Sequence, residues 1–341
     1  MQRARRAFSI IELLVVIAIV AILLAIILPA IAGVRRAARG SDTQTLLTEI
    51  AQAAARYELD KRVAPGYFTA RDMGSPDNAD RGFSAMQNIM LSLAGGVVDG
   101  AGAGTIEVGP LNRSEGRVRV APARIGSAAV GAYYVPAPKF FVAQDQPGQR
   151  VPSSISTEND ELPEVVDSWG TPVLAWQATG PSPYSIDTLD DFAANASGGP
   201  GADSVFYWAS NAAFLGNGAD GVGKLRKNQS VLSLLRVDGT NHLRTMAAVL
   251  GDPSNPLDET ASRADMLPAA PRAGLVLHSA GADGVYLSTE DRGGRGAVNG
   301  ALLYGAALKD EGNQRIRDAA GKGTFRDLTG DFDDLFLRGG R

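Results

Sequence analysis

The sequence predicts an α+β protein in which one long N-terminal helix precedes a body of short strands and long loops. Residues 8–28 form an apolar run whose only charged member is Glu12, and apolar residues continue beyond it at three- and four-residue steps. The chain of 341 residues also contains 40 Gly and 18 Pro, which favours short elements joined by long connections. Together these observations predict the long helix and the loop-rich body behind it.

The apolar run at residues 8–28 is long enough to cross a bilayer as a helix, because roughly 20 residues at about 1.5 Å each span the hydrocarbon core. Arginines flank it on both sides: Arg3, Arg5 and Arg6 before, and Arg35, Arg36 and Arg39 after. The basic leader indicates that this end stays in the cytoplasm. Glu12 is the exception inside the run. A carboxylate there costs several kcal/mol unless it is paired, so Glu12 is a candidate functional residue.

Pro29 follows the run and should kink the helix without ending it, since apolar periodicity resumes beyond it. The amphipathic stripe consists of Ile31, Val34, Ala38, Leu46, Ile50, Ala54 and Tyr57. We therefore predict one helix from Phe8 to Lys61. Its first part (8–28) lies in the membrane, and its second part (29–62) packs on a globular domain (63–341).

The charge of the chain is unevenly distributed. The formal net charge is −4, but residues 1–40 carry +5 and the remaining residues carry −9. An acidic body argues against nucleic acid as a partner. The chain has no cysteine, which excludes disulfides, zinc–thiolate sites and thiol nucleophiles.

The body contains several short candidate elements. Residues 62–130 are interpreted as an insertion with a helical segment at 84–94. Candidate strands lie at 106–108, 117–120, 130–135, 139–142, 173–176, 205–209 and before 280, and candidate helices at 229–236 and 260–267.

Three interpretations compete for the N-terminal segment. A cleavable signal peptide fits the basic start and a cleavage-like Ala-Ile-Ala before Gly33, but the apolar run is much longer than the usual 7–15 residues. A plain membrane anchor explains the length but leaves Glu12 without a role. The third interpretation rests on a family resemblance.

Residues 5–23, RRAFSIIELLVVIAIVAIL, resemble the cleavage and methylation segment of type IV pilins and type II secretion pseudopilins. The resemblance implies that a prepilin peptidase cuts between Ala7 and Phe8, which defines residues 1–7 as a leader. It also implies N-methylation of Phe8 and a helix bend at Pro29. Ala7 stands where the family usually has glycine and keeps a small side chain.

The same resemblance implies a pilin-like fold, with the long helix packed on a small antiparallel sheet enlarged by insertions. It implies a structural subunit that polymerises through its N-terminal helix, with Glu12 of one subunit neutralising the amino terminus of a neighbour. Such a buried pair selects register more than it adds stability. The implied partners are other pilin or pseudopilin subunits, the prepilin peptidase, an inner-membrane assembly platform and the membrane itself. The body would lie in the periplasm or extracytoplasmic space.

Two segments of the body extend the resemblance. Asp167-Ser168-Trp169-Gly170-Thr171-Pro172 is similar to a turn that leads into the sheet of major pseudopilins, with the tryptophan expected to plug the turn to the core. The strand 275–279 and the following Ala280-Gly-Ala-Asp283-Gly are similar to their calcium-binding loop. The implied calcium ligands are the Ala280 carbonyl, Asp283, and an acidic pair at Asp333 and Asp334. Glu290 and Asp291 are the alternative pair, because they lie closer in the sequence.

The sequence offers no positive sign of an enzyme. Its two histidines, His242 and His278, stand in no metal-binding pair, and no Gly-x-Ser-x-Gly motif is present. With 37 Asp and Glu residues, a carboxylate-pair hydrolase stays open. The alternative function is therefore a membrane-anchored binding or hydrolytic domain that does not polymerise.

Overall fold

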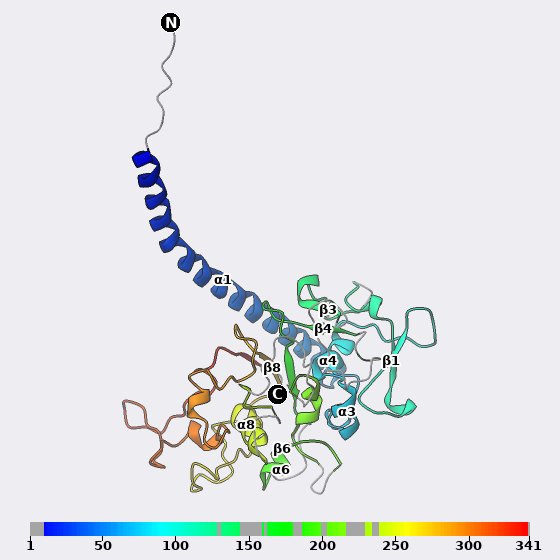
Figure 1. Cartoon of the computed structure of the whole chain (residues 1–341). Coiled ribbons are helices and arrows are strands. Elements are labelled where there is room, and N and C mark those ends of the chain that lie inside the picture. Colours follow the sequence, from blue (N-terminus) through cyan, green and yellow to red (C-terminus); the bar gives the residue numbers. More distant parts are fainter. Residues whose placement is uncertain are drawn as a thin grey trace.

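The computed structural model describes residues 10–127, 131–143, 159, 162–179, 186–198, 203–215, 229–233 and 239–339. These residues form an α+β protein, as predicted: a long helix, α1 (Ile10–Lys61), crosses a body of short helices and small sheets (Figure 1). The N-terminal half of α1 projects alone from this body (Figure 1).

The remaining elements are short. The helices are α2 (Ala70–Met73), α3 (Pro76–Arg81), α4 (Ala85–Leu93), α6 (Leu189–Phe192), α7 (Ala212–Leu215) and α8 (Asn241–Leu250). The strands are β1 (Ile106–Val108), β2 (Val118–Val120), β3 (Phe141–Ala143), β4 (Pro163–Val165), β5 (Leu174–Gln177), β6 (Ala193–Ala194), β7 (Phe206–Tyr207), β8 (Leu275–Ser279) and β9 (Leu335–Gly339). Single 3-10 turns lie at Ser114–Gly116, Pro122–Arg124, Pro138–Phe140, Trp208–Asn211, Gly294–Gly296 and Tyr304–Ala307.

Helix α1 runs for 52 residues and continues through Pro29, as the resumed periodicity predicts. Figure 1 shows that it curves between its free half and the body. Proline removes one backbone hydrogen bond and crowds the preceding turn, which bends a helix without necessarily ending it. The helix ends where Arg62 adopts a left-handed φ of 60° and its amide donates to the Glu58 carbonyl at 2.9 Å.

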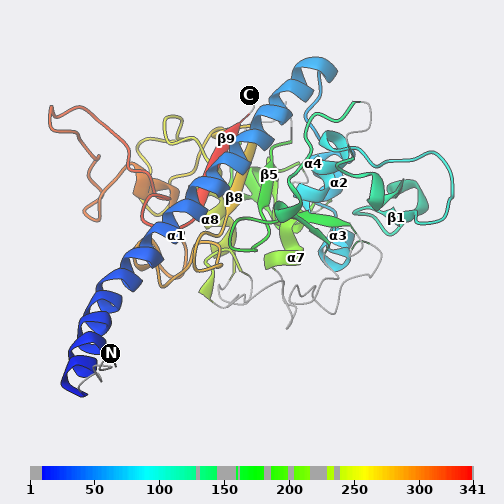
Figure 2. The same ribbon diagram turned by 90° about the horizontal axis from the view of Figure 1, so that it is seen from above.

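The second half of α1 is anchored by an apolar stripe on one face. Leu46, Leu47 and Ile50 are at most 1% exposed and share a core with Leu277 of β8 and Ile89 of α4. Full burial of one such side chain contributes about 1.5–3 kcal/mol. Figure 2 shows α1 lying across β8 and β9. This packing joins the helix to the sheet.

The central sheet has the order β5–β8–β9 and is antiparallel throughout. Trp176 of β5 pairs with Val276 of β8, and His278 of β8 pairs with Phe336 of β9. Alternate residues of each strand face opposite sides of the sheet. One face, with Ala175 among its residues, packs on α1 and α4, while the other belongs to the core around α8.

Smaller sheets surround this centre. The pairs β1–β2 and β3–β4 are antiparallel, and the two-residue pair β6–β7 is parallel. The predicted insertion after α1 has its own small core around Met73, Phe83 and Val108. It contains α4, close to the helical segment predicted at 84–94.

Several predicted elements differ from the observed ones. Residues 260–267 form turns, not a helix, because Leu257 and Leu267 are joined by a backbone hydrogen bond of 2.8 Å. The described part of the second predicted helix, 229–233, forms turns and a bridge from Ser230 to Ser288. Residues 131–135 form no strand, whereas β4, β6, β9 and α8 were not predicted.

Candidate functional site

The N-terminal site lies in the free half of α1. Glu12 occupies the first turn of the helix and is exposed. Ala7 and Phe8 lie outside the described residues. The large apolar side chains from Ile10 to Leu28 are between 46% and 79% exposed. No part of the most apolar 18-residue window of this helix is buried inside the molecule, and its mean hydropathy is 3.4. The free half of α1 therefore needs a bilayer or other apolar helices to cover it.

The turn at Asp167 connects α1 to the central sheet. Asp167 Oδ1 accepts hydrogen bonds from the amides of Trp169 and Thr171, both at 2.9 Å, and Gly170 supplies a left-handed φ of 86°. The Ser168 amide donates to Thr43 Oγ1 of α1 at 3.1 Å. Burial raises the pKa of Asp167, an effect partly offset by its hydrogen bonds.

Trp169 lies against α1, and not in the core as expected. It is only partly buried, and a Cβ on Gly40 would be 4.0 Å from its Cη2 atom. The tryptophan that fills the core is Trp176 of β5, which is 2% exposed. The turn thus places an aromatic ring where the helix leaves the body.

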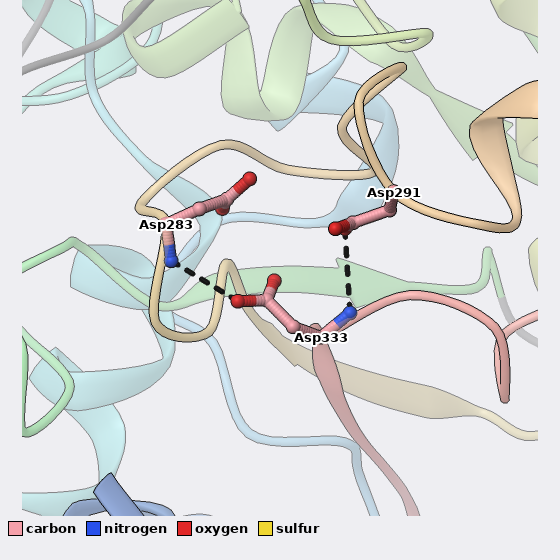
Figure 3. A group of neighbouring side chains, drawn as sticks. All are labelled: Asp283, Asp291 and Asp333. Carbon is pink, nitrogen blue, oxygen red and sulfur yellow. Dashed lines mark hydrogen bonds between the residues drawn. The ribbon is translucent and has the colours of Figure 1, made fainter. Parts of the chain in front are cut away.

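The second site is a group of three carboxylates: Asp283 and Asp291 from the loop after β8, and Asp333 from the segment before β9 (Figure 3). One oxygen from each lies within 4.8 Å of the others. Asp333 Oδ2 accepts from the amides of Ala282 and Asp283 at 2.9 and 3.1 Å. The Asp333 amide donates to Asp291 Oδ2 at 3.3 Å (Figure 3). The backbone therefore holds segments about 40 residues apart in register.

The three charges act on one another. Loss of hydration, together with the negative charges of Asp283 and Asp291, raises the pKa of Asp333 to about 7. Loss of hydration also raises the pKa of Asp283, and Asp291 adds to the effect. The group is consequently crowded with negative charge, an environment in which a cation is favoured.

Gly281 makes the close approach of the two segments possible. Its φ is +68°, and a Cβ added there would lie 2.2 Å from the Asp333 carbonyl oxygen. Any larger residue would combine a strained φ with a backbone clash. A glycine therefore follows Ala280 in the sequence because only this residue can pack so closely against Asp333.

The other expected carboxylate ligands, Asp334 and Glu290, do not belong to this group. Asp334 turns inward, where its carboxylate contacts His278 Nε2 at 2.6 Å and accepts from the Leu287 amide. Burial raises the pKa of Asp334 well above its usual value. Glu290 accepts a hydrogen bond from Gln229 Nε2, and Ala280 is fully buried at the start of the loop.

Both histidines are buried. His278 has no exposed surface and stacks on Phe336, with ring centroids 4.1 Å apart, and burial lowers its pKa to about 3. His242 is 1% exposed, its Nε2 lies 2.5 Å from Asn195 Oδ1, and burial lowers its pKa to about 4. Both rings therefore act as packed, neutral side chains at neutral pH.

Two residues that organise the site were not identified from the sequence. Thr43 and Ser279 each hold one end of the Asp167 turn through a side-chain oxygen. Both are fully buried. A polar residue inside the apolar stripe of the helix, as Thr43 is, was the available signal.

The oxygen donors of the three clustered aspartates fit calcium. Calcium takes six to eight oxygen ligands from carboxylates, carbonyls and water in flexible loops. Asp283, Asp291 and Asp333 offer three carboxylates at one point of the surface.

Comparison with known proteins gives a match at the N-terminus. A family model described as the prokaryotic N-terminal methylation motif matches residues 2–28. No curated protein and no solved structure matches the chain significantly.

Proposed function

This chain carries the N-terminal segment of a prepilin-peptidase-processed, type IV pilin-like protein, and we propose that it is a structural subunit of a type II secretion pseudopilus or a type IV pilus-like filament. In this proposal the peptidase removes residues 1–7 and the subunit polymerises through α1. The observation that carries the proposal is the exposed apolar half of α1 with Glu12 in its first turn.

The position of Glu12, inside the apolar run and in the first turn of α1, supports a role in assembly. A helix inserted in lipid alone gains nothing from a carboxylate, which costs several kcal/mol in the hydrocarbon. Cleavage before Phe8 creates an α-amino group four residues away, and this cation on one subunit can pair with Glu12 of a neighbour. A half-made pair is far less favourable than a complete one, so pairing would set the register between subunits.

The proposed orientation places the body outside the cytoplasm. The basic leader stays inside, α1 crosses the membrane once, and the acidic body lies in the periplasm or extracytoplasmic space. The partners are then other subunits of the filament, the prepilin peptidase and an assembly platform in the inner membrane. In this proposal the assembled filament, and not the single subunit, acts in protein transport.

We further propose that Asp283, Asp291 and Asp333 bind calcium. Bound calcium would offset two of the three negative charges and tie the loop after β8 to the segment before β9. The Ala280 carbonyl is a candidate fourth ligand. Backbone amides preorganise the site. Those of Ala282 and Asp283 donate to the Asp333 carboxylate, and that of Asp333 donates to the Asp291 carboxylate.

The assembly proposal is tested by expressing the full chain with its assembly machinery and examining sheared surface filaments by electron microscopy. Glu12→Ala should abolish filaments while the protein still fractionates with the membrane. Glu259→Ala, which removes an exposed carboxylate from the body, is the matched control and should assemble. Normal filaments from Glu12→Ala would contradict the pairing argument, and a wild type that never assembles would favour a membrane anchor.

A further inference from the structure

Three arginines form a basic cluster on α1, between the apolar run and the body. Arg35, Arg36 and Arg39 are all exposed. They occur at three- and four-residue spacings, so their side chains share one side of the helix. We use the name basic cluster for these three residues. Its position suggests what it contacts.

The depth of the basic cluster follows from the spacing of charges along α1. Between Glu12 and Arg35 the helix has 22 residues without a charge. At about 1.5 Å per residue they extend roughly 33 Å, close to the thickness of about 30 Å of a bilayer's hydrocarbon core. When Arg35 lies in the headgroup layer on one side of the bilayer, Glu12 therefore lies just inside the hydrocarbon core at the other side.

The basic cluster also faces a particular direction. Arg36 and Arg39 stand seven and four residues before Thr43, and the same spacing continues through Leu46 and Ile50. The later residues of this stripe are the ones that the body buries. The arginines thus lie on the body side of α1, in the space between the globular domain and the membrane surface.

No carboxylate in the described part of the chain forms an ion pair with the basic cluster. Asp42, three residues after Arg39, pairs instead with Lys139 Nζ at 2.8 Å. Like charges three or four residues apart on a helix repel one another. An external anion would remove this repulsion.

We propose that Arg35, Arg36 and Arg39 bind the anionic phospholipid headgroups of the extracytoplasmic leaflet and hold the body at the membrane before assembly. Arginine stems lie along apolar surface while their guanidinium groups reach phosphates, often with two hydrogen bonds. The cluster has as many arginines as the leader, so it weakens the charge asymmetry that orients the helix. Contact with anionic lipid on the outer side offsets the weakened charge asymmetry. This inference rests on the proposed insertion of α1.

A test needs a bilayer that holds a single subunit, so that no neighbouring chain can supply the anion. Full-length protein is reconstituted at one copy per nanodisc in equimolar phosphatidylcholine and phosphatidylglycerol. Native mass spectrometry then counts the lipids that remain bound. An arginine at an anionic surface contributes about fivefold in affinity, so the wild type should retain phosphatidylglycerol about tenfold or more over phosphatidylcholine.

The variants separate charge from folding. Arg35→Gln/Arg36→Gln/Arg39→Gln should lose the preference, and the corresponding triple Lys variant should keep most of it. The matched control removes three exposed charges roughly 25–40 Å farther along the chain, at and just beyond the end of α1, as Arg56→Gln/Lys61→Gln/Arg62→Asn, and should bind lipid like the wild type. Asparagine is used at 62 because it tolerates the left-handed φ there.

Two outcomes would overturn the proposal. One is equal retention of both lipids by the wild type, and the other is an unchanged preference in the triple Gln variant. If the latter variant also fails to form filaments, the arginines serve a contact between subunits instead. Normal processing and assembly without a lipid preference would refute only the lipid contact and leave the proposed function intact.

Discussion

Ser279 Oγ donates a hydrogen bond to Asp167 Oδ2 at 2.7 Å, across 112 residues of sequence. Both residues are at most 2% exposed. The bond joins the turn that holds α1 to the end of the strand that leads into the carboxylate group. Through the Ser168 amide and Thr43, the loop after β8 and helix α1 thus belong to one hydrogen-bonded unit.

Ser279→Ala should lower the free energy of unfolding by about 1–3 kcal/mol, because it leaves a buried carboxylate oxygen without this donor. Chemical denaturation of the full chain in detergent measures the change. Ser127→Ala is the control, since its hydroxyl bonds a carbonyl at an exposed position, and it should change stability by less than about 0.5 kcal/mol. Equal losses of unfolding free energy in the two variants would show that the buried hydrogen bond stabilises the protein no more than the exposed one.

Gly281→Ala should destabilise the body and weaken calcium binding together. The added Cβ would meet the Asp333 carbonyl oxygen at 2.2 Å in a left-handed backbone conformation, and we expect a loss of at least about 2 kcal/mol. Gly296→Ala is the matched control, because no atom lies within 4 Å of its added Cβ and its φ is not left-handed. Thermal unfolding and calcium titration of both variants test this, and a wild-type-like Gly281→Ala would refute the packing argument.

Calcium should stabilise the protein more at pH 8 than at pH 5.5. The pKa of Asp333 is about 7 in the folded protein against 3.8 for the free side chain. The folded state therefore holds the proton more tightly, and this contribution to stability is lost as pH rises from about 3.8 through 7. Calcium binds the carboxylates without competition from that proton only above this range.

At a calcium concentration 100 times its Kd, the expected gain at pH 8 is about 2.7 kcal/mol. Melting curves with calcium and with chelator at both pH values measure it. Asp333→Asn should remove the calcium effect, and magnesium at the same concentration serves as the ion control. A shift that is absent at pH 8, or equal at both pH values, would contradict the proposed site.

The stability of the calcium-free protein should fall in acid because of His242. Its pKa is about 4 in the folded state and 6.5 when free, so the unfolded chain binds a proton first. Among the described residues the buried Nδ1 of His242 has no hydrogen-bond partner, and a proton there would be unsatisfied. Stability from this residue is complete above about pH 6.5 and falls by about 2–3 kcal/mol toward pH 4.

His242→Gln isolates this contribution from that of His278, whose pKa is lowered in the same direction. The variant should have a flatter stability profile between pH 6.5 and 4 than the wild type. Denaturant titrations across that range measure both profiles. Parallel profiles would show that His242 is not the titrating group.

The sequence was sufficient for the features that have a strong local signal. The apolar run and its continuing period predict the end of α1 at Lys61, and the apolar stretches at 106–108 and 275–277 predict β1 and β8. Helix α8 was not predicted because its first turn is polar and its stability comes from the core around it. The segment 260–267 contains residues that favour a helix, but hydrogen bonds between its backbone and the side chains of Arg244, Lys309 and Asn313 hold it in turns.

The sequence also could not determine which acidic residues form the site of three carboxylates. Asp333 and Asp334 are neighbours at the entrance to β9, where successive side chains point to opposite faces. Asp333 joins Asp283 at the surface, whereas Asp334 faces His278 in the interior. Only the three-dimensional register decides which of the two meets the loop, and whether Asp291 or Glu290 completes the group.

The most direct test of the central claim is mass spectrometry of the mature amino terminus in protein purified from membranes. We expect a chain that begins at Phe8 and carries a methyl group on its α-amine. A chain that begins at Met1, or at Gly33 after signal-peptide cleavage, would contradict it.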